Sequence, residues 1–409
     1  MSRRFRKFNT IGDEETKEIL AVLQSGNLSG FYGSWSEEFY GGPYVKRLEQ
    51  MAEREFETKN AVTFNSWTSA LVAAVGSLDV EPGDEIIVSP WTMSATAMAI
   101  LHWNCVPVFS DINKDTYCLD EAKLIEKINP HTKAIIAVDI FGQSSRTEKL
   151  MEIAEEHEIK VISDSAQAAG AKRNNKFAGT LSHFGGISLN YHKHIHTGEG
   201  GILFTDDDEL AFRSRLIRNH AESVVGGAGV EKINNMIGHN FRMTELQAAI
   251  GVAQLPKLKG IVAQREYQGQ YLSERLGNLA GLRAPIVDTN NSHVFYTLAF
   301  QIDQSIVKSS RDEIVKDLTR QGVPGLTSTY PLLHLLPMFQ RKVAYGSRGF
   351  PWNLRKETSS MSYSKGICPV AESLIENTFF HLYLNEFDFD QDDMDYIVDI
   401  FESRWQHYL

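Results

Sequence analysis

The sequence has few cysteines, no long apolar run and a deficit of positive charge, and each of these narrows the possible classes of protein. Only three cysteines occur among 409 residues, without a CxxC pair, which argues against a disulfide framework or structural zinc and favours a reducing cytoplasm. A formal net charge of −11 argues against nucleic acid or an anionic membrane as a partner. No apolar run reaches the length needed to span a bilayer.

A short basic run opens the chain and does not lead into an apolar stretch. Arg3, Arg4, Arg6 and Lys7 stand close together, whereas a secretory signal would continue into an apolar segment. We therefore expect a solvated tail here and a cytoplasmic protein.

The overall composition, with 42% hydrophobic and 23% charged residues, is ordinary for a globular protein with a large core. The length suggests two or three structural domains, or one large α/β unit with a smaller domain.

Short apolar segments alternate with amphipathic ones from about residue 60 to residue 207. Continuous apolar strands between helices indicate a buried, mainly parallel sheet, whose ligands lie beyond the carboxyl ends of the strands. The expected strands are 60–64, 85–88, 106–112, 133–140, 160–164, 184–190 and 200–205, and the expected helices include 68–78, 120–128, 145–158 and 208–219.

The pattern changes after a long helical stretch that begins near residue 244 and that Pro256 should interrupt. The remaining pattern indicates a smaller α+β domain. Its expected parts are a strand at 295–301, a helix at 311–320, a loop-rich section at 322–367 and a helix at 390–407.

The first candidate site is the turn at residues 63–71. A strand ends at Phe64, and small polar residues lead into an apolar helix. Free backbone N–H groups and the positive end of a helix dipole make such a turn a natural seat for phosphate. Taken alone, an ordinary N-cap by Ser66 or Thr68 explains this pattern better.

The second candidate is Asp164, a carboxylate that follows directly on a buried strand. A buried acid must be paired, hydrogen-bonded or neutralised. A cationic partner such as a pyridinium nitrogen would meet that need. A cap for the next segment accounts for Asp164 equally well.

The third candidate is Lys193, on an irregular segment that ends in glycines. A lysine in such a place can have a depressed pKa and form an imine with an aldehyde, although lysines are in general mostly exposed. His192, His194 and His196 alternate, so on an extended strand they would share one face and could ligate a metal. No acidic or cysteine ligand accompanies them at supporting spacing, and we rank that interpretation well below the lysine.

The fourth segment, residues 238–250, shows a polar loop and then Thr244 as the N-cap of an amphipathic helix. The residues alone indicate nothing further.

Together these four segments have the order and sequence of a known family. From Gly26 through the C-terminal region the chain resembles the sugar aminotransferases of the DegT/DnrJ/EryC1/StrS family. Several matches in order are stronger evidence than one. The most specific are Lys193 with Gly198–Gly201 and the segment Gly238–Ile250; lesser ones are Pro82–Glu85, Phe141–Gln143 and Tyr330 with His334.

The resemblance implies the α/β fold-type-I architecture of pyridoxal-phosphate (PLP) enzymes. The large PLP-binding domain, residues 1–258, would contain a mainly parallel seven-stranded sheet, and residues 259–409 would form the small C-terminal α+β domain.

The resemblance also implies a role for individual residues. Lys193 would be the Schiff-base lysine and later the proton shuttle, Asp164 would pair with the pyridinium nitrogen, and Gln167 would contact the phenolic oxygen. The remaining implied contacts are Ser66, Trp67, Thr68 and Ser188 around the phosphate, Asn240 from the neighbouring subunit of a homodimer, and Arg242, Tyr330 and His334 toward the substrate.

The sequence departs from the family where an aromatic side chain usually stacks on the cofactor. Met93 occupies that position, so either its thioether or the ring of Trp91 would pack there. Residues 31–40 also look like extra length that would shape the sugar site.

The leading hypothesis is transfer of an amino group, with glutamate as donor, to a carbonyl carbon of a sugar. The substrate would be a nucleotide-linked keto-sugar or an octulosonate-type aldehyde, for lipopolysaccharide or another surface polysaccharide. Alternatives are a PLP dehydratase, in which the family replaces the lysine by histidine, a non-catalytic regulatory homologue that binds sugar or PLP, and a metal-dependent hydrolase that uses the histidines.

Overall fold

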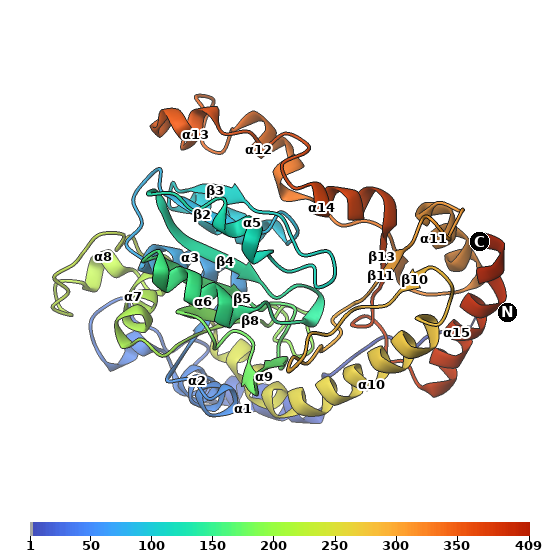
Figure 1. Cartoon of the computed structure of the whole chain (residues 1–409). Helices are drawn as coiled ribbons and strands as arrows, with labels where there is room; N and C mark the ends of the chain where they lie inside the picture. Colours follow the sequence, from blue (N-terminus) through green and yellow to red (C-terminus); the bar gives the residue numbers. More distant parts are fainter. Residues whose placement is uncertain (1–2) are drawn as a thin grey trace.

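The computed structural model describes residues 3–409 and contains one large and one small sheet (Figure 1). In the large sheet the strand order is β1-β9-β8-β5-β4-β2-β3, and only β9 runs against its neighbours. The expected mainly parallel, seven-stranded sheet is therefore confirmed. Its strands are β1 (Asn60–Phe64), β2 (Glu85–Val88), β3 (Val106–Phe109), β4 (Thr132–Val138), β5 (Lys160–Asp164), β8 (Phe184–Ser188) and β9 (Gly201–Thr205).

Helices cover both faces of this sheet, which explains why its strands are apolar without alternation. Alternate residues still point to opposite faces: Ile86 and Val88 pack in the core with α3 and α4, whereas Ile87 packs in the core with α5 and α6. The covering helices are α2 (Pro43–Phe56), α3 (Trp67–Ser77), α4 (Ser94–His102), α5 (Glu121–Ile125), α6 (Thr147–Glu156), α7 (Asp208–Arg218) and α9 (Glu245–Gln254), and α1 (Asp13–Ser25) packs on α9.

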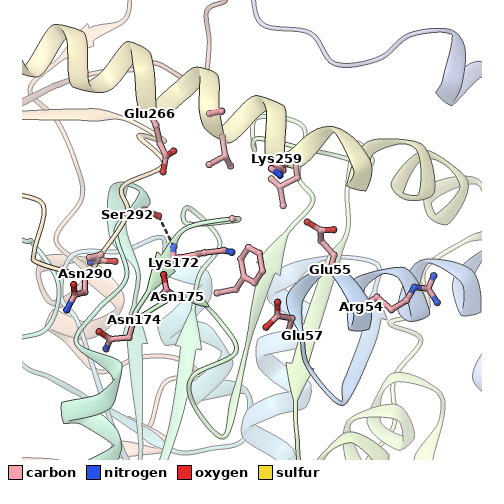
Figure 2. A pocket seen from close by; sticks show the side chains of 16 residues that line it. Arg54, Glu55, Glu57, Lys172, Asn174, Asn175, Lys259, Glu266, Asn290 and Ser292 are labelled. Atoms are coloured by element: carbon pink, nitrogen blue, oxygen red, sulfur yellow. Dashed lines mark hydrogen bonds between the residues drawn. The ribbon is translucent and has the colours of Figure 1, made fainter.

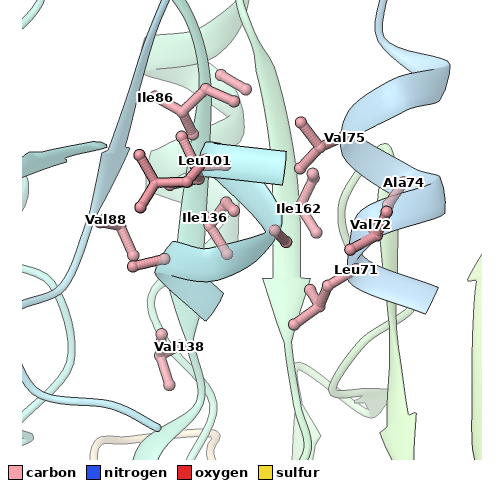
Figure 3. Close-up of a cluster of buried hydrophobic side chains, with 14 of the residues drawn as sticks. Leu71, Val72, Ala74, Val75, Ile86, Val88, Leu101, Ile136, Val138 and Ile162 are labelled. Carbon is pink, nitrogen blue, oxygen red and sulfur yellow. The ribbon is translucent and has the colours of Figure 1, made fainter. Parts of the chain in front are cut away.

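Figure 3 shows the core between the sheet and its first helices. Leu71 and Val75 of α3 and Leu101 of α4 face Ile136 and Ile162 of the central strands, and all five side chains are buried. Burial of each such side chain contributes about 1.5–3 kcal/mol relative to exposure. This core fixes the position of the first turn of α3 relative to the carboxyl end of β5.

The long helical stretch is not interrupted as strongly as expected. After α9, Pro256 lies in a single 3₁₀ turn (Leu255–Lys257), and α10 (Leu258–Leu276) continues directly from it. Proline is tolerated there because the first residues of a helical turn need no N–H donor. The chain therefore leaves the large sheet along α10 toward the small one (Figure 1).

The small sheet is antiparallel, in the order β10-β11-β13-β12, and has its own hydrophobic core with the helices α11 and α15. Its elements are β10 (Leu282–Arg283), β11 (Leu298–Ile302), α11 (Arg311–Gln321), β12 (Leu326–Thr327), β13 (Phe379–Leu382) and α15 (Gln391–Trp405).

The section between β12 and β13 contains short helices and returns to the large sheet. Phe339, Trp352 and Tyr363 belong to the core of the large sheet, and the Tyr363 hydroxyl donates to the carbonyl of Pro107 at 2.7 Å. This section runs along the β2–β3 edge in Figure 1. Its helices are α12 (Pro337–Arg341), α13 (Lys356–Ser360) and α14 (Pro369–Ser373).

The basic side chains at the N-terminus are exposed, as expected, but the segment is not a free tail. The N–H of Phe8 donates to the carbonyl of Glu386 at 3.0 Å, and the N–H of Asp388 donates to the carbonyl of Arg6 at 2.9 Å, so backbone hydrogen bonds attach this segment to the small domain. Arg3 also pairs with Asp393 at 2.6 Å and Lys7 with Glu386 at 3.1 Å. Figure 1 shows both ends of the chain beside α15. Between residues 3 and 409, no helix combines the length and apolar character required to cross a membrane.

Glycine at the start of β9 allows α3 to approach the sheet, which predicts a steric effect of Gly201→Ala. A Cβ atom there would lie 2.7 Å from both the backbone nitrogen and the Cα of Trp67, and backbone atoms cannot move aside as a side chain can. We expect a loss of about 1–3 kcal/mol in the free energy of unfolding, measured by chemical denaturation.

Gly260→Ala, in α10, is the matched control because an added Cβ meets nothing within 4 Å. It should leave stability unchanged or raise it by about 0.5–1 kcal/mol, since alanine is the better helix former. Equal stability of the two variants would contradict the packing argument.

Candidate active site

A cavity of about 160 Å³ lies beyond the carboxyl ends of β5 and β8, beside the first turn of α3. This is the sheet edge at which the alternating pattern predicted ligand binding. It is lined by Ser66, Trp67, Thr68, Thr92, Met93, Ala95, Val138, Asp164, Ala166, Gln167, Ser188, Asn190, His192, Lys193 and Glu199.

The N-terminus of α3 presents backbone donors to this cavity. Ser66 is the N-cap, and its Oγ accepts the N–H of Ser69 at 3.1 Å. Within residues 3–409 the N–H groups of Trp67 and Thr68 have no hydrogen-bond acceptor. Two free donors at the positive end of a helix dipole form an anion site that suits a phosphate group.

Asp164 is held by two side-chain donors. The indole Nε1 of Trp67 donates to Oδ1 and the hydroxyl of Thr96 donates to Oδ2, both at 2.7 Å. The carboxylate is only 5% exposed, and its two donors hold it in one orientation. The sequence did not reveal the role of Thr96, because the contact joins the ends of β5 and α4; its spacing from Thr92, whose hydroxyl lies 3.0 Å away, was the available signal.

Lys193 lies in the same cavity with its amine away from water. The side chain is 8% exposed, and Nζ lies 4.6 Å from the centroid of the Tyr296 ring. Across residues 3–409 no hydrogen bond from Nζ is formed. Burial lowers the pKa of Lys193 to about 8, and the charge of Asp164 opposes this shift in part. About a tenth of the amine is therefore uncharged at pH 7, far more than for an ordinary lysine.

Gln167 connects the cavity to the segment between β12 and α12, which contains Tyr330. Its Oε1 accepts the N–H of Phe141 at 2.8 Å, and its Nε2 donates to the Tyr330 hydroxyl at 3.1 Å. Burial raises the pKa of Tyr330, so this hydroxyl stays neutral. Of the three side chains expected at the substrate, Tyr330 is thus the one linked to a residue of the cavity wall.

Met93, and not Trp91, lines the cavity. Met93 is 62% exposed at the N-cap of α4. Trp91 is fully buried and packs edge-on against Phe379 at 4.6 Å, within the aromatic core. Trp91 was one of the two alternatives for contact with the cofactor. The structure corrects this expectation, because the Trp91 ring is used for packing.

His334 also differs from expectation. It is fully buried away from the cavity, and its Nε2 lies 2.8 Å from Oε1 of Glu372. A side chain enclosed in this way contacts no substrate. Its role is to connect the segment before α12 to α14.

The three alternating histidines do not form a metal site. Their segment is a turn and not an extended strand, so the side chains diverge. His192 lines the cavity, Nε2 of His194 bonds the carbonyl of Val294 at 2.9 Å, and Nδ1 of His196 accepts the N–H of Gly198. Among residues 3–409 no three metal-ligating side chains converge.

Asn240 and Arg242 lie next to the cavity entrance but do not line it. The carbonyl of Phe241 accepts the N–H of Asn65 at 2.9 Å, which places this loop beside the first turn of α3. The side chain of Asn240 is exposed, and its Oδ1 accepts Nε of Arg242 at 2.8 Å.

A larger groove lies elsewhere and lacks comparable chemistry. It is bounded by the end of α2, the hairpin of β6 (Lys172–Arg173) and β7 (Lys176–Phe177), and the start of α10. Figure 2 shows charged groups of both signs spread around an open space. None of the residues predicted for catalysis lines it.

The comparisons with known proteins agree with this site. The model of the DegT/DnrJ/EryC1/StrS aminotransferase family matches residues 9–370. The chain belongs to this family. It is 31% identical over 360 residues to the spore coat polysaccharide biosynthesis protein SpsC of Bacillus subtilis, covering 86% of this chain and 90% of that protein. It is 33% identical over 303 residues to a GDP-perosamine synthase of Caulobacter vibrioides, covering 73% of this chain and 79% of that protein.

A solved structure supports the fold. It is GDP-4-keto-6-deoxymannose-3-dehydratase, described with a trapped PLP–glutamate geminal diamine. The two structures have a TM-score of 0.76 at 24% identity, covering 96% of this chain and 98% of the other. The architecture is therefore that of the PLP enzymes of fold type I, and the family is PLP-dependent.

The residues of the cavity fit PLP. The free N–H groups at the start of α3 suit its phosphate, the charged Asp164 suits a protonated ring nitrogen, and the partly uncharged Lys193 amine suits its aldehyde. This chain is a PLP-dependent aminotransferase.

The lowered pKa of Lys193 predicts how PLP attachment depends on pH. The rate at which cofactor-free protein bonds PLP covalently should rise with pH to half its maximum near pH 8, because only the uncharged amine attacks an aldehyde. Ordinary lysines would titrate near about 10.4. Stopped-flow absorbance across pH 6–10 measures the rate.

Lys193→Ala is the control for that experiment and should lose this phase. A midpoint above pH 10 in the native sequence would show that the amine is solvated.

Proposed function

We propose that this aminotransferase transfers an amino group from glutamate to a carbonyl carbon of a sugar. The observation that carries this proposal is the buried, partly uncharged amine of Lys193 in a cavity that also contains Asp164 and the N-terminus of α3. The sugar class is supported by the names of relatives, among them the GDP-perosamine synthase and the spore coat polysaccharide protein.

The residues of the cavity divide the work of holding the cofactor. The first turn of α3, with Ser66 and Thr68, would bind the phosphate together with Ser188 at the end of β8. Trp67 would contribute its backbone N–H to that site, and its indole orients Asp164. Met93 would contact the ring of PLP, and Gln167 its phenolic oxygen.

The chemistry then follows from two ionisable groups of this chain. Bound PLP supplies a ring that accepts the electrons of a substrate carbanion. The carboxylate of Asp164 keeps a proton on the nitrogen of that ring, because a nearby anion favours the cationic form. The amine of Lys193 Nζ removes a proton from the substrate carbon and returns one, which its pKa of about 8 permits near neutral pH.

A homodimer would complete the site. The exposed Asn240 and its partner Arg242 stand beside the cavity entrance of their own chain without lining it. In a two-fold dimer the same loop of the second subunit can reach toward the phosphate and the substrate. The volume of about 160 Å³ is also below the roughly 300–1,000 Å³ usual for ligand sites, which supports a second subunit as part of the wall.

We place the substrate among nucleotide-linked keto-sugars or octulosonate-type sugar aldehydes, destined for lipopolysaccharide or another surface polysaccharide. The first class receives support from the GDP-sugar relative. We place the enzyme in the cytoplasm, since its three cysteines are free and buried. A dehydratase remains the second candidate, because the similar solved structure is a dehydratase by title.

We divide the chain into a large domain, residues 1–258, and a small one, residues 259–409. The separate core of the small sheet supports this division. The segment from Leu332 to Phe379 is an excursion of the small domain into the core of the large one.

The first prediction concerns the amine. Lys193→Ala should still bind PLP noncovalently, because the phosphate and ring contacts remain, but should lose turnover since no amine is left to move the proton. Mass spectrometry of products from glutamate and a panel of keto-sugars and sugar aldehydes measures activity. Borohydride reduction followed by peptide mapping identifies the modified lysine.

Lys172→Ala is the matched control, since Lys172 lies in the groove of Figure 2 and not in the cavity. Borohydride labelling of any lysine other than Lys193 would overturn the assignment. A dehydrated, nitrogen-free product would favour the second candidate.

The second prediction concerns sharing between subunits. Lys193→Ala and Asn240→Asp each damage both sites of a homodimer, the latter by placing a negative charge near a phosphate. In a mixed dimer one site receives both defects and the other receives neither. Random mixing should therefore restore activity to about a quarter of that of the unmodified enzyme.

Two different affinity tags allow the mixed dimers to be isolated and counted. Mixed dimers that form but remain inactive would show that Asn240 serves its own chain.

A further inference from the structure

Asp139 is a second buried carboxylate behind the active site, and it does not line the cavity. It follows the last residue of β4 and is 0% exposed. Val138 pairs with Asp164 in the parallel register of β4 and β5. The two carboxylate-bearing residues thus stand at the ends of adjacent strands.

Asp139 contacts the backbone of Asp164 and the side chain of the residue that follows it. Its backbone N–H donates to the carbonyl of Asp164 at 3.0 Å, and its Oδ2 accepts the hydroxyl of Ser165, the next residue, at 2.5 Å. Its Oδ1 accepts the N–H of Ser145 at 2.7 Å. A shift of Asp139 would therefore move the backbone that carries Asp164.

An asparagine would satisfy this geometry without burying a charge. Its amide oxygen would accept from Ser145 and its amide NH₂ would donate to the oxygen of Ser165. Since burial of an ionised group without a cationic partner is costly, the presence of a carboxylate calls for an electrostatic reason.

The charged groups that face Asp139 are few. Burial raises the pKa of Asp139 to about 6, the hydrogen bonds from Ser165 and Ser145 oppose this rise, and the negative charge of Asp164 adds to it. The thiol of Cys118 also lies nearby, and its own pKa is raised mainly by burial and further by Asp139, so the thiol stays neutral. Asp139 can therefore change charge within the pH range of an assay.

We propose that Asp139 is a positioning residue for Asp164: it holds the Asp164 carbonyl and the Ser165 hydroxyl in place and puts a second negative charge behind the Asp164 carboxylate. This inference rests on the proposed role of Asp164. A cation held by Asp164 is stabilised by the added charge, because the Coulomb interaction is weakly screened inside the protein. Asp139 itself touches neither cofactor nor substrate.

The test is the pH profile of kcat for Asp139→Asn, which keeps the shape and removes the charge. The unmodified enzyme should lose activity in two steps as pH falls: one near pH 8, from protonation of Lys193, which the variant shares, and an acid limb near pH 6 as Asp139 becomes protonated. The variant should be about tenfold slower above pH 7, lack this acid limb, and converge with the unmodified enzyme at low pH. KM for the sugar should stay unchanged.

Ser165→Ala supplies a second readout that a purely structural role would not move. Loss of its hydrogen bond removes a group that favours the ionised carboxylate, so the acid limb should shift to higher pH. Asp111→Asn is the matched control, since Asp111 is a buried carboxylate at the same sheet edge that accepts the N–H groups of Val370 and Ala371. It should leave the pH profile unchanged.

A measurement on cofactor-free protein separates this inference from catalysis. The folded-state pKa of Asp139 lies above its unfolded value, so the folded state binds more protons between about pH 4 and 6. As pH rises through this window, the Tm of the unmodified protein should therefore fall relative to the Tm of Asp139→Asn. Above the window the difference between the two Tm values should stay constant.

The outcomes distinguish the two proposals. If Asp164→Asn retains full turnover, the proposed function fails and this inference with it. If Asp164→Asn is impaired while Asp139→Asn and Ser165→Ala show the acid limb of the unmodified enzyme, only the role of Asp139 is overturned. A Tm difference that is independent of pH would overturn its titration.

Discussion

The hydrogen bond from the Trp67 indole to the carboxylate of Asp164 connects the two halves of the candidate site. It joins the first turn of α3, which carries the free backbone donors, to the end of β5, which carries the charge. The ring reaches Asp164 only because Gly186 and Gly201 leave space on β8 and β9, where a Cβ atom would lie within 2.7 Å of Trp67. The distance between the anion seat and the carboxylate is therefore set by packing inside the sheet and does not depend on a ligand.

Much of the large domain was predictable because its signals are local. The strands appear in the sequence as apolar segments with helices between them. Each expected strand is present, with bounds that differ by a few residues from those expected. The strand expected at 106–112 ends at Phe109, and that expected at 184–190 ends at Ser188, where the chain turns into the site. Asp164 was singled out by its place at the end of a strand and Lys193 by its irregular segment that ends in glycines, and the structure brings both into one cavity.

Other features were not predictable because they depend on contacts between distant segments. The family resemblance could not show that Trp91 and His334 are enclosed in the core, since burial is decided by the return of residues 332–379 to the large sheet. Thr96 acts on Asp164 from the first turn of α4, and Asp139 acts on it from the end of the neighbouring strand β4. The attachment of the N-terminal basic run was not predictable because its partners stand almost 400 residues later.

Buried carboxylates outnumber buried amines at this edge of the large sheet. One buried amine faces one carboxylate, and a second carboxylate stands behind the first without a cation of its own. The cavity therefore favours a positively charged group beside Asp164 and a negatively charged group beside the N-terminus of α3. A zwitterionic ring with a phosphate arm has this distribution of charge.

The attachment of residues 3–8 to the small domain changes how the two domains are connected. Residues 3–8 contact the chain near residues 386–393 of the small domain. Helix α1 follows and is held at the junction of α9 and α10 by the ion pair of Glu15 with Lys257. Three separate segments therefore connect the small domain to the large one: the N-terminal segment, α10, and residues 332–379. A domain connected through three segments has less freedom to move relative to its neighbour than one connected through a single linker.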